Sequence, residues 1–357
     1  MRAGLTSYLF NSIKIFTGIV VVTVVVSGCG HPKPPQNLAK PHHTPEGFKN
    51  NYAGAVNKTF GELIRWQRER QAAGLPKSPD APTPAMTPDL PAIKAYLDAP
   101  HSSPAITWIG HASMLVQAGG LNVLTDPIFS NRASPISLIG PERKQPPGLQ
   151  LADLPVIDVV LISHNHYDHL DRPSVLELAN RSEAAGKPTL FIVPLGMKAW
   201  FADLGIKNTV ELDWWDKHVY KGVEFNFTPV QHWSARSPSD RSQTLWGGYA
   251  VFAPDLHWYF SGDTGYSKDF ADTGARFADR HTAARGGGFD LALLPIGAYQ
   301  PRWFLAEQHI DPAEAVQIHR DLASKRSVGI HWGTFELSDE SLDQPPRDLA
   351  LAARAKG

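Results

Sequence analysis

The feature that most constrains this chain is a run of metal-binding side chains directly after an apolar segment. Residues 156–162 form an apolar run rich in β-branched side chains, which predicts a buried strand. The loop that follows carries His164, His166, Asp168 and His169 within six residues. Packing does not account for such a cluster, because buried polar groups destabilise a fold unless they are paired or coordinated. Imidazole and carboxylate together suit zinc or another borderline divalent metal.

Three further candidate ligands, His232, Asp263 and His331, each come directly after another predicted strand. With the four on the first loop they make a set of seven (4 + 3), more than one tetrahedral metal takes. Seven ligands suffice for two metals if one carboxylate bridges them, and Asp263 is the natural bridge. Two metals a few ångströms apart hold a hydroxide and stabilise the transition state of phosphoryl or acyl hydrolysis.

The remaining pattern predicts strands in two groups with helices between them, which is typical of a layered α/β architecture. The expected strands cover residues 106–109, 113–116, 121–124, 156–162, 189–193, 223–228, 249–252, 258–260, 291–295 and 328–330. Helices are expected over residues 174–185 and 312–324, and Gly119-Gly120 is expected to form a hairpin turn.

The beginning of the chain has the composition of a targeting segment rather than of folded structure. Arg2 and Lys14 give it positive charge, and residues 15–26 form an apolar stretch. The residues up to Cys29 resemble a bacterial lipobox, in which cleavage before the cysteine leaves a thiol that carries a diacylglyceryl group. Cys29 is the only cysteine, so neither an internal disulfide nor a thiolate metal ligand is expected. The alternative is an uncleaved membrane helix, for which the apolar stretch is short.

Three regions are therefore expected along the chain. They are a lipoprotein signal peptide at residues 1–28, a tether and N-terminal extension with one helix at 29–100, and the main domain at 101–357. Thr59 and Glu62 form a potential capping box for that helix. Lipid on Cys29 implies anchoring in a bacterial cell envelope, on the periplasmic face of the outer membrane if the cell is Gram-negative. The net charge of −1 indicates no strong attraction to nucleic acid.

The metal-binding loop followed by His, Asp and His at strand ends resembles the metallo-β-lactamase fold family. Within that fold, longer motifs are similar to the N-acylphosphatidylethanolamine phospholipase D family. These motifs are residues 124–130, 163–171, 262–266, 295–299, 301–304, 308–312 and 330–335, within a resemblance that covers roughly residues 100 to 340. The resemblance implies a four-layer αβ/βα sandwich with the metals at one edge. It further implies a dizinc phosphodiesterase that cleaves a membrane phospholipid into N-acylethanolamine and phosphatidic acid.

Site residues are carried over from the family by matching position. His164, His166 and His232 would hold one zinc, and Asp168, His169 and His331 the other, with Asp263 bridging. Asp168 and Asp263 would orient the nucleophile, and Gln308 and His309 would lie near the substrate head group, with His309 among the catalytic residues. Asp126 matches an aspartate that orients a ligand histidine through its other ring nitrogen. A homodimer would also resemble the family.

Other interpretations stay open at this point. A different hydrolase on the same scaffold, such as a lactonase or nuclease, is one of them, although a lactonase does not need the matches at 301–304 and 308–309. A β-lactamase differs around Asp168, and a non-catalytic envelope lipoprotein that binds metal or lipid is the alternative without chemistry. We interpret His111 as structural rather than as a ligand. His309 is either an active-site residue or a cap for the helix that begins near residue 312.

Overall fold

The computed structural model describes residues 34, 36–53, 56–98, 103–281 and 286–356. The expected signal peptide at residues 1–28 and the expected lipidation site at Cys29 lie outside these residues. All described residues belong to one unit, Pro32–Gly357, and the description below concerns that unit. Within the described ranges, no helix has both the length and the apolar character needed to cross a membrane.

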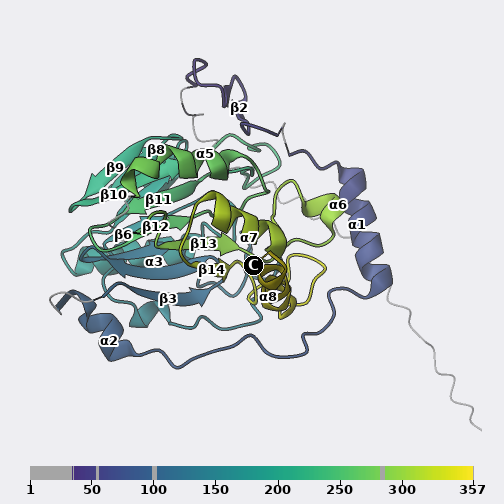
Figure 1. The fold of residues 1–357 in the computed structure, drawn as a ribbon, viewed down its shortest axis with the longest axis horizontal. Coiled ribbons are helices and arrows are strands. Elements are labelled where there is room, and N and C mark those ends of the chain that lie inside the picture. Colours follow the sequence, from purple (N-terminus) through teal and green to yellow (C-terminus); the bar gives the residue numbers. More distant parts are fainter. Residues whose placement is uncertain (1–33, 35, 54–55, 99–102, 282–285, 357) are drawn as a thin grey trace, which may run out of the picture. The chain divides into compact units, whose positions relative to one another are not determined.

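Two six-stranded β-sheets form the middle layers of this unit (Figure 1). The first sheet has the order β3-β4-β5-β6-β7-β8, with bounds Ala105–Gly110, Ser113–Ala118, Leu121–Thr125, Val159–Leu161, Leu190–Pro194 and Thr209–Leu212. The second has the order β14-β13-β12-β11-β10-β9, with bounds Ser327–Ile330, Leu291–Pro295, His257–Phe260, Gly248–Phe252, Val223–Thr228 and Lys217–Tyr220. Each sheet is therefore built from one continuous half of the domain.

Each sheet combines antiparallel and parallel pairing. In the first sheet β3, β4 and β5 are antiparallel, and β5 to β8 are parallel. In the second sheet β9 to β12 are antiparallel, and β12, β13 and β14 are parallel. Parallel neighbours need long crossover connections, which bring helices onto the outer faces and leave loops at the carboxyl ends of the strands.

The larger apolar core lies between the two sheets, and a second core lies under the helices of the first sheet. Strand β6 shows the division: Val159 and Leu161 belong to the first core, and Val160 belongs to the second. Successive side chains of a strand point to opposite faces, so a run that is apolar at every position can fill both cores. This explains why the predicted strand at residues 156–162 is apolar almost throughout.

Helices cover both outer faces. On the first sheet these are α3 (Arg172–Ala184) and α4 (Lys198–Asp203), which contribute Val175 and Phe201 to the second core. On the second sheet α5 (Asp269–Arg276) and α7 (Pro312–Asp321) contribute Phe270 and Ile318 to the larger core, which therefore also extends to the outer face of this sheet. Helix α8 (Gln344–Lys356) packs on α7 (Figure 1). The helix–sheet–sheet–helix order confirms the expected αβ/βα sandwich.

The N-terminal extension holds more structure than the single helix expected from the sequence. Helix α1 (Phe60–Ala73) begins with the expected capping box of Thr59 and Glu62. A second helix, α2 (Leu90–Ala95), continues into the 3-10 turn η1 (Tyr96–Asp98). Pro91 lies in the first turn of α2, where proline is tolerated because no backbone donor is needed there. Short 3-10 turns also occur at η2 (Leu151–Asp153) and η3 (Ala278–Arg280).

Part of the segment expected as a tether is packed on the domain. Residues 36–53, which we name the N-terminal arm, include the short strands β1 (His43–Thr44) and β2 (Gly47–Phe48). Phe48 of the arm is buried in the core between the sheets. The composition of this segment resembles a linker, but its buried contacts, described below, hold it in place.

Candidate metal centre

The seven predicted ligands meet at one edge of the sandwich, and they come from both sheets. The loop after β6 brings His164, His166, Asp168 and His169, while the segments that follow β10, β12 and β14 bring His232, Asp263 and His331. Asp263 lies between two imidazoles: its Oδ2 is 3.1 Å from His169 Nε2, and its Oδ1 is 3.2 Å from His331 Nε2. The structure thus places the whole predicted set together, with Asp263 in the middle.

One group in this set consists of three imidazoles. His166 Nδ1 lies 2.8 Å from His164 Nε2 and 3.4 Å from His232 Nε2. The other ring nitrogen of His232, Nδ1, donates to the carbonyl oxygen of Gln308 at 2.9 Å. In a neutral ring this leaves the Nε2 lone pair of His232 free and directed at the other two rings. These three nitrogens are close enough together to bind one metal ion.

A second group consists of Asp168, His169 and His331, beside Asp263. His169 Nδ1 donates to Asp126 Oδ2 at 2.7 Å, so that His169 Nε2 faces Asp263. Asp168 Oδ2 is 3.3 Å from His169 Nε2 and 3.4 Å from His331 Nε2. Asp126 thus lies on the side of the His169 ring that points away from Asp263.

Burial sets the charge of the three imidazoles in the first group. It lowers the pKa of His166 to about 3, and it lowers the pKa of His164 and His232 well below the ordinary value. These three rings are therefore neutral near pH 7, which a metal ligand requires. Burial alone would raise the pKa of Asp263, but the charges of His169 and His331 beside it hold that pKa well below its usual range. Asp263 is therefore an ionised carboxylate.

Two buried atoms of the cluster fit a bound cation. His169 Nε2 and Asp263 Oδ1 have no hydrogen-bond partner within the described part of the chain. A buried polar atom without a partner costs about 1–3 kcal/mol. Divalent cations would satisfy these atoms, because imidazole nitrogen and carboxylate oxygen are the ligands that zinc prefers. The residues present therefore fit one or two metal ions of the zinc type.

His111 is buried beside the second group and acts on its ligands. Burial lowers the pKa of His111 to about 3, so the ring is neutral, and its Nε2–H donates to Asp168 Oδ2 at 2.9 Å. The backbone carbonyl of His111 accepts the N–H of His331 at 2.9 Å. Both His111 (φ 52°) and His331 (φ 62°) have left-handed backbone, a strained state that clusters at functional sites. These contacts let His111 fix the position of Asp168. His111 also lies close enough to Asp168, His169 and His331 to join them around a metal ion, so its interpretation as structural rather than as a ligand stays a prediction.

Gln308 and His309 lie at the rim, next to the first group. The backbone oxygen of Gln308 accepts from His232, and its side-chain Oε1 accepts the indole N–H of Trp233 at 2.8 Å. His309 Nδ1 lies 3.8 Å from Asp263 Oδ2, and burial lowers the pKa of His309 to about 4. His309 is not the cap of α7, since Asp311 fills that role through a capping box.

Two residues of the site were not marked by any sequence pattern. The indole of Trp233 packs against His166, with ring centroids 4.3 Å apart. Arg236 Nη1 donates to the carbonyl oxygens of Asn165 at 2.9 Å and Leu170 at 2.8 Å, at the two ends of the metal-binding loop. Both follow the predicted ligand His232 closely in the chain, and this was the sequence feature that could have pointed to them.

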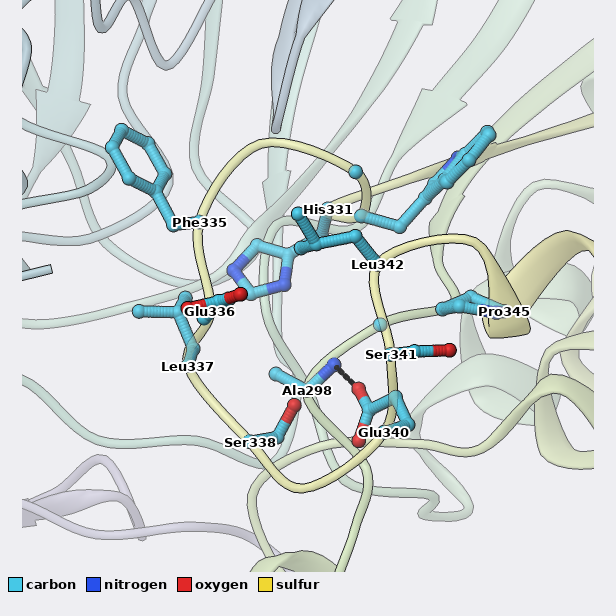
Figure 2. Close-up of a pocket in the computed structure, with 13 residues that line it drawn as sticks. Ala298, His331, Phe335, Glu336, Leu337, Ser338, Glu340, Ser341, Leu342 and Pro345 are labelled. Atoms are coloured by element: carbon cyan, nitrogen blue, oxygen red, sulfur yellow. Dashed lines mark hydrogen bonds between the residues drawn. The ribbon is translucent and has the colours of Figure 1, made fainter. Parts of the chain in front are cut away.

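A small pocket behind the second group shows how His331 is supported. Figure 2 shows His331 among the lining residues, with Glu340 below it and hydrogen-bonded to Ala298. Glu340 accepts the backbone N–H groups of Ala298 at 2.6 Å and of Gln300 at 3.0 Å. Phe335 closes the other side, against the edge of the His111 ring. The carboxylate thus ties the loop after His331 to the loop after β13.

A cluster of histidines and aspartates at the strand ends of an αβ/βα sandwich defines the metal-dependent hydrolases with a metallo-β-lactamase fold. Residues 121–332 match the family model described as "Beta-lactamase superfamily domain". The chain belongs to this superfamily and is a metal-dependent hydrolase.

Individual relatives narrow the class. The chain is 36% identical over 331 residues to "N-acyl-phosphatidylethanolamine-hydrolyzing phospholipase D 1" of Caenorhabditis elegans, and the aligned region covers 88% of each chain. It is 37% identical over 258 residues to the mitochondrial protein of that name from Saccharomyces cerevisiae, covering 70% of this chain and 52% of the yeast protein. The solved metallo hydrolase Igni18 of Ignicoccus hospitalis superposes with a TM-score of 0.51 at 19% identity, covering 71% of this chain and 92% of that one, which supports the fold alone.

Proposed function

We propose that this protein is a dizinc phosphodiesterase of phospholipase D type that hydrolyses N-acylphosphatidylethanolamine-like lipids. One observation carries the proposal: a single carboxylate oxygen, Asp263 Oδ2, lies 3.1 Å from His169 Nε2 of the second group and 4.0 Å from His232 Nε2 of the first. The identity of 36% and 37% to two relatives named for this reaction supports the substrate class. The products would be phosphatidic acid and an N-acylethanolamine.

The proposed ligand sets follow the two groups. His164, His166 and His232 would hold one cation, Asp168, His169 and His331 the other, with Asp263 shared. When bound, two cations make water more acidic and neutralise negative charge that develops on the phosphate oxygens.

The side chains of the chain itself supply orientation. Asp168 and Asp263 are ionised and fixed, Asp168 by the N–H of His111, so both can accept the hydrogens of a water that attacks phosphorus. That attack forms a bond between phosphorus and the water oxygen and breaks the bond to the ethanolamine oxygen. The departing oxygen takes the proton that the water loses. His309, neutral and at the rim, is placed to contact the phosphate or its leaving group.

Location is part of the proposal. A diacylglyceryl group on Cys29, in the envelope of a bacterium, would hold the enzyme at the surface that contains its substrate. Substrate would then reach the site by diffusion within the membrane rather than from solution.

The test uses the chain from Gly30 onward with N-acylphosphatidylethanolamine in mixed micelles and identification of products by mass spectrometry. We expect phosphatidic acid and N-acylethanolamine, both lost after chelation and restored by zinc. Asp263→Asn serves as the matched inactive control. Turnover of lactones or other phosphodiesters without turnover of this lipid would overturn the substrate. Turnover that survives complete removal of metal would overturn the metal chemistry.

A further inference from the structure

A residue far outside the matched family domain holds the backbone of a metal ligand. Asn50, in the N-terminal arm, is buried against His232. Its Oδ1 accepts the N–H of His232 at 3.0 Å, and its Nδ2 donates to the carbonyl oxygen of His232 at 3.0 Å. One side-chain amide therefore pairs with both backbone groups of this ligand. The family model begins at residue 121, so this contact joins the matched domain to a segment that precedes it.

A third group, the indole of Trp246, fixes the orientation of the Asn50 side-chain amide. The indole Nε1–H of Trp246 lies 3.1 Å from Asn50 Oδ1 and also 3.1 Å from the carbonyl oxygen of Val230. Two donors on Oδ1 and one acceptor facing Nδ2 define which end of the amide is oxygen. Trp246 is fully buried, so the arrangement is part of the core.

The arm is anchored by a buried carboxylate at the end of β8. Asp213 Oδ1 lies 2.7 Å from His42 Nε2, and Asp213 Oδ2 lies 2.9 Å from His43 Nε2 and 2.6 Å from Lys40 Nζ. His42 also stacks on the ring of Trp214, with centroids 4.4 Å apart. These contacts hold the first part of the arm so that Asn50 can reach His232.

A glycine permits the close approach of the arm. The N–H of Phe48 donates to the carbonyl oxygen of Ser242 at 2.8 Å. A Cβ atom on the preceding Gly47 would lie 2.1 Å from that same oxygen, which no side chain tolerates. The arm can therefore dock in this position only with glycine at residue 47.

The cluster around Asp213 has the residue types of a metal site, but its hydrogen bonds indicate an anchor. The backbone N–H of Asn37 donates to His43 Nδ1 at 3.0 Å, so Nδ1 carries no proton. A neutral ring then carries its proton on Nε2, which donates to Asp213 instead of offering a lone pair to a cation. The Lys40 ammonium on the same carboxylate also disfavours a cation there.

We propose that the N-terminal arm is a structural part of the metal centre and that Asn50 is a positioning residue for the ligand His232. The amide fixes the backbone from which the imidazole projects, so its loss lets Nε2 drift from the point that it shares with His164 and His166. The inference rests on the proposal that His232 binds a metal, and it does not depend on the substrate. Loss of a partner that orients a ligand typically weakens metal binding by ~10–100-fold.

The test compares zinc affinity in variants of the chain from Gly30 onward, by competition with a chromophoric chelator. Asn50→Ala removes the two hydrogen bonds, and Gly47→Ala displaces the arm without changing Asn50. Asn51→Ala is the control for the first variant, since Asn51 makes one hydrogen bond from the arm to Asp269, away from the ligands. Gly61→Ala is the control for the second, because a Cβ there meets only one atom, at 3.9 Å.

We expect Asn50→Ala and Gly47→Ala to release one of two zinc ions ~10–100-fold more readily, with both controls like the wild type. Cobalt-substituted protein provides a second readout, since the absorption of the altered site should shift in these two variants alone. Unchanged affinity and spectra in Asn50→Ala would overturn the inference, as would equal loss in Asn50→Ala and Asn51→Ala. A wild-type chain that binds no zinc would instead overturn the proposed function.

Discussion

Asp126 and His169 are joined by a hydrogen bond of 2.7 Å in which both side chains are fully buried. Asp126 has a left-handed backbone (φ 33°) and also accepts the N–H of Ser163 at 2.7 Å. The carboxylate therefore fixes the imidazole that faces Asp263 and, through Ser163, the start of the metal-binding loop. A single residue at the end of β5 thus controls the geometry of a loop 37 residues further along the chain.

Replacement of Asp126 should weaken metal binding without removing a ligand. We expect Asp126→Ala to lower zinc affinity by ~10–100-fold, because His169 loses the acceptor that orients it. Titration against a chelator measures this. Asp80→Asn, which changes an exposed carboxylate paired with Arg347, is the control and should bind zinc like the wild type. Equal affinity in Asp126→Ala and wild type would contradict the role.

Replacement of a proposed ligand should abolish turnover and leave the fold intact. We expect Asp263→Asn and His164→Ala to lose more activity than the ~10–100-fold typical of changes behind a ligand. Both residues lie at strand ends beyond the apolar core, so circular dichroism should show an unchanged fold. Retained turnover in Asp263→Asn would rule out Asp263 as a shared ligand.

Arg236 should stabilise the folded protein through its contacts with the metal-binding loop. Its guanidinium joins two carbonyl oxygens of the metal-binding loop and lies over the ring of Tyr167. We expect Arg236→Met to lower the free energy of unfolding by about 1.5–3 kcal/mol, the range for hydrogen bonds to a charged group. Chemical denaturation measures the change. Arg326→Lys on the exposed surface is the control, and an equally small effect in both variants would refute the prediction.

Helix α1 should detach when its central aromatic side chain is removed. Trp66 stacks on Phe304, with centroids 4.8 Å apart, and its indole donates to Asp339 at 2.9 Å. Phe304 lies in helix α6 (Arg302–Leu305), which Figure 1 shows beside α1. Truncation of a buried Trp costs about 3–5 kcal/mol, so Trp66→Ala should expose α1 to limited proteolysis. Phe60→Ala, which alters an exposed side chain of the same helix, should leave the cleavage rate unchanged. Faster cleavage of Phe60→Ala than of Trp66→Ala would contradict this packing.

Acid should release the N-terminal arm through Asp213. Burial alone would raise the pKa of Asp213, but hydrogen bonds from His42, Lys40 and His43 hold it well below its usual range. A second carboxylate, Asp216, also faces Lys40, with its Oδ1 3.8 Å from Lys40 Nζ. With a depressed folded-state pKa, the stabilisation is complete above the unfolded-state value of about 3.9 and is lost as the pH falls below it. Thermal denaturation of wild type and Asp213→Asn at a series of pH values measures this, and the difference between them should shrink below about pH 3.9. A difference that is the same at every pH would contradict the assignment.

The sequence predicted those features of the fold and of the site that short-range patterns determine. Strand ends that carry His and Asp predicted the site, because the carboxyl ends of parallel strands meet at one edge of a sheet. The capping box at Thr59 was likewise readable, since Glu62 lies three residues away.

Other structural features could not be predicted, because they depend on contacts between residues far apart in the sequence or lack a clear local pattern. Asn50 is polar, lies in a segment that resembles a linker, and contacts a residue 182 positions away. Nothing local distinguishes it from Asn51. Strand β9 has an exposed–intermediate alternation with little apolar character, so it was not predicted. The short helix α4 was missed because six residues are too few to show a helical period.

The division of the ligands between the sheets has a consequence for assembly. All strands of the first sheet precede those of the second, and the ligands follow the same division: four come from the loop after β6, and three from the ends of β10, β12 and β14. A chain cut between β8 and β9 would leave an incomplete set of ligands in each fragment. A metal ion ligated by both fragments would then hold them together, so the amount of reassembled domain should increase with added zinc.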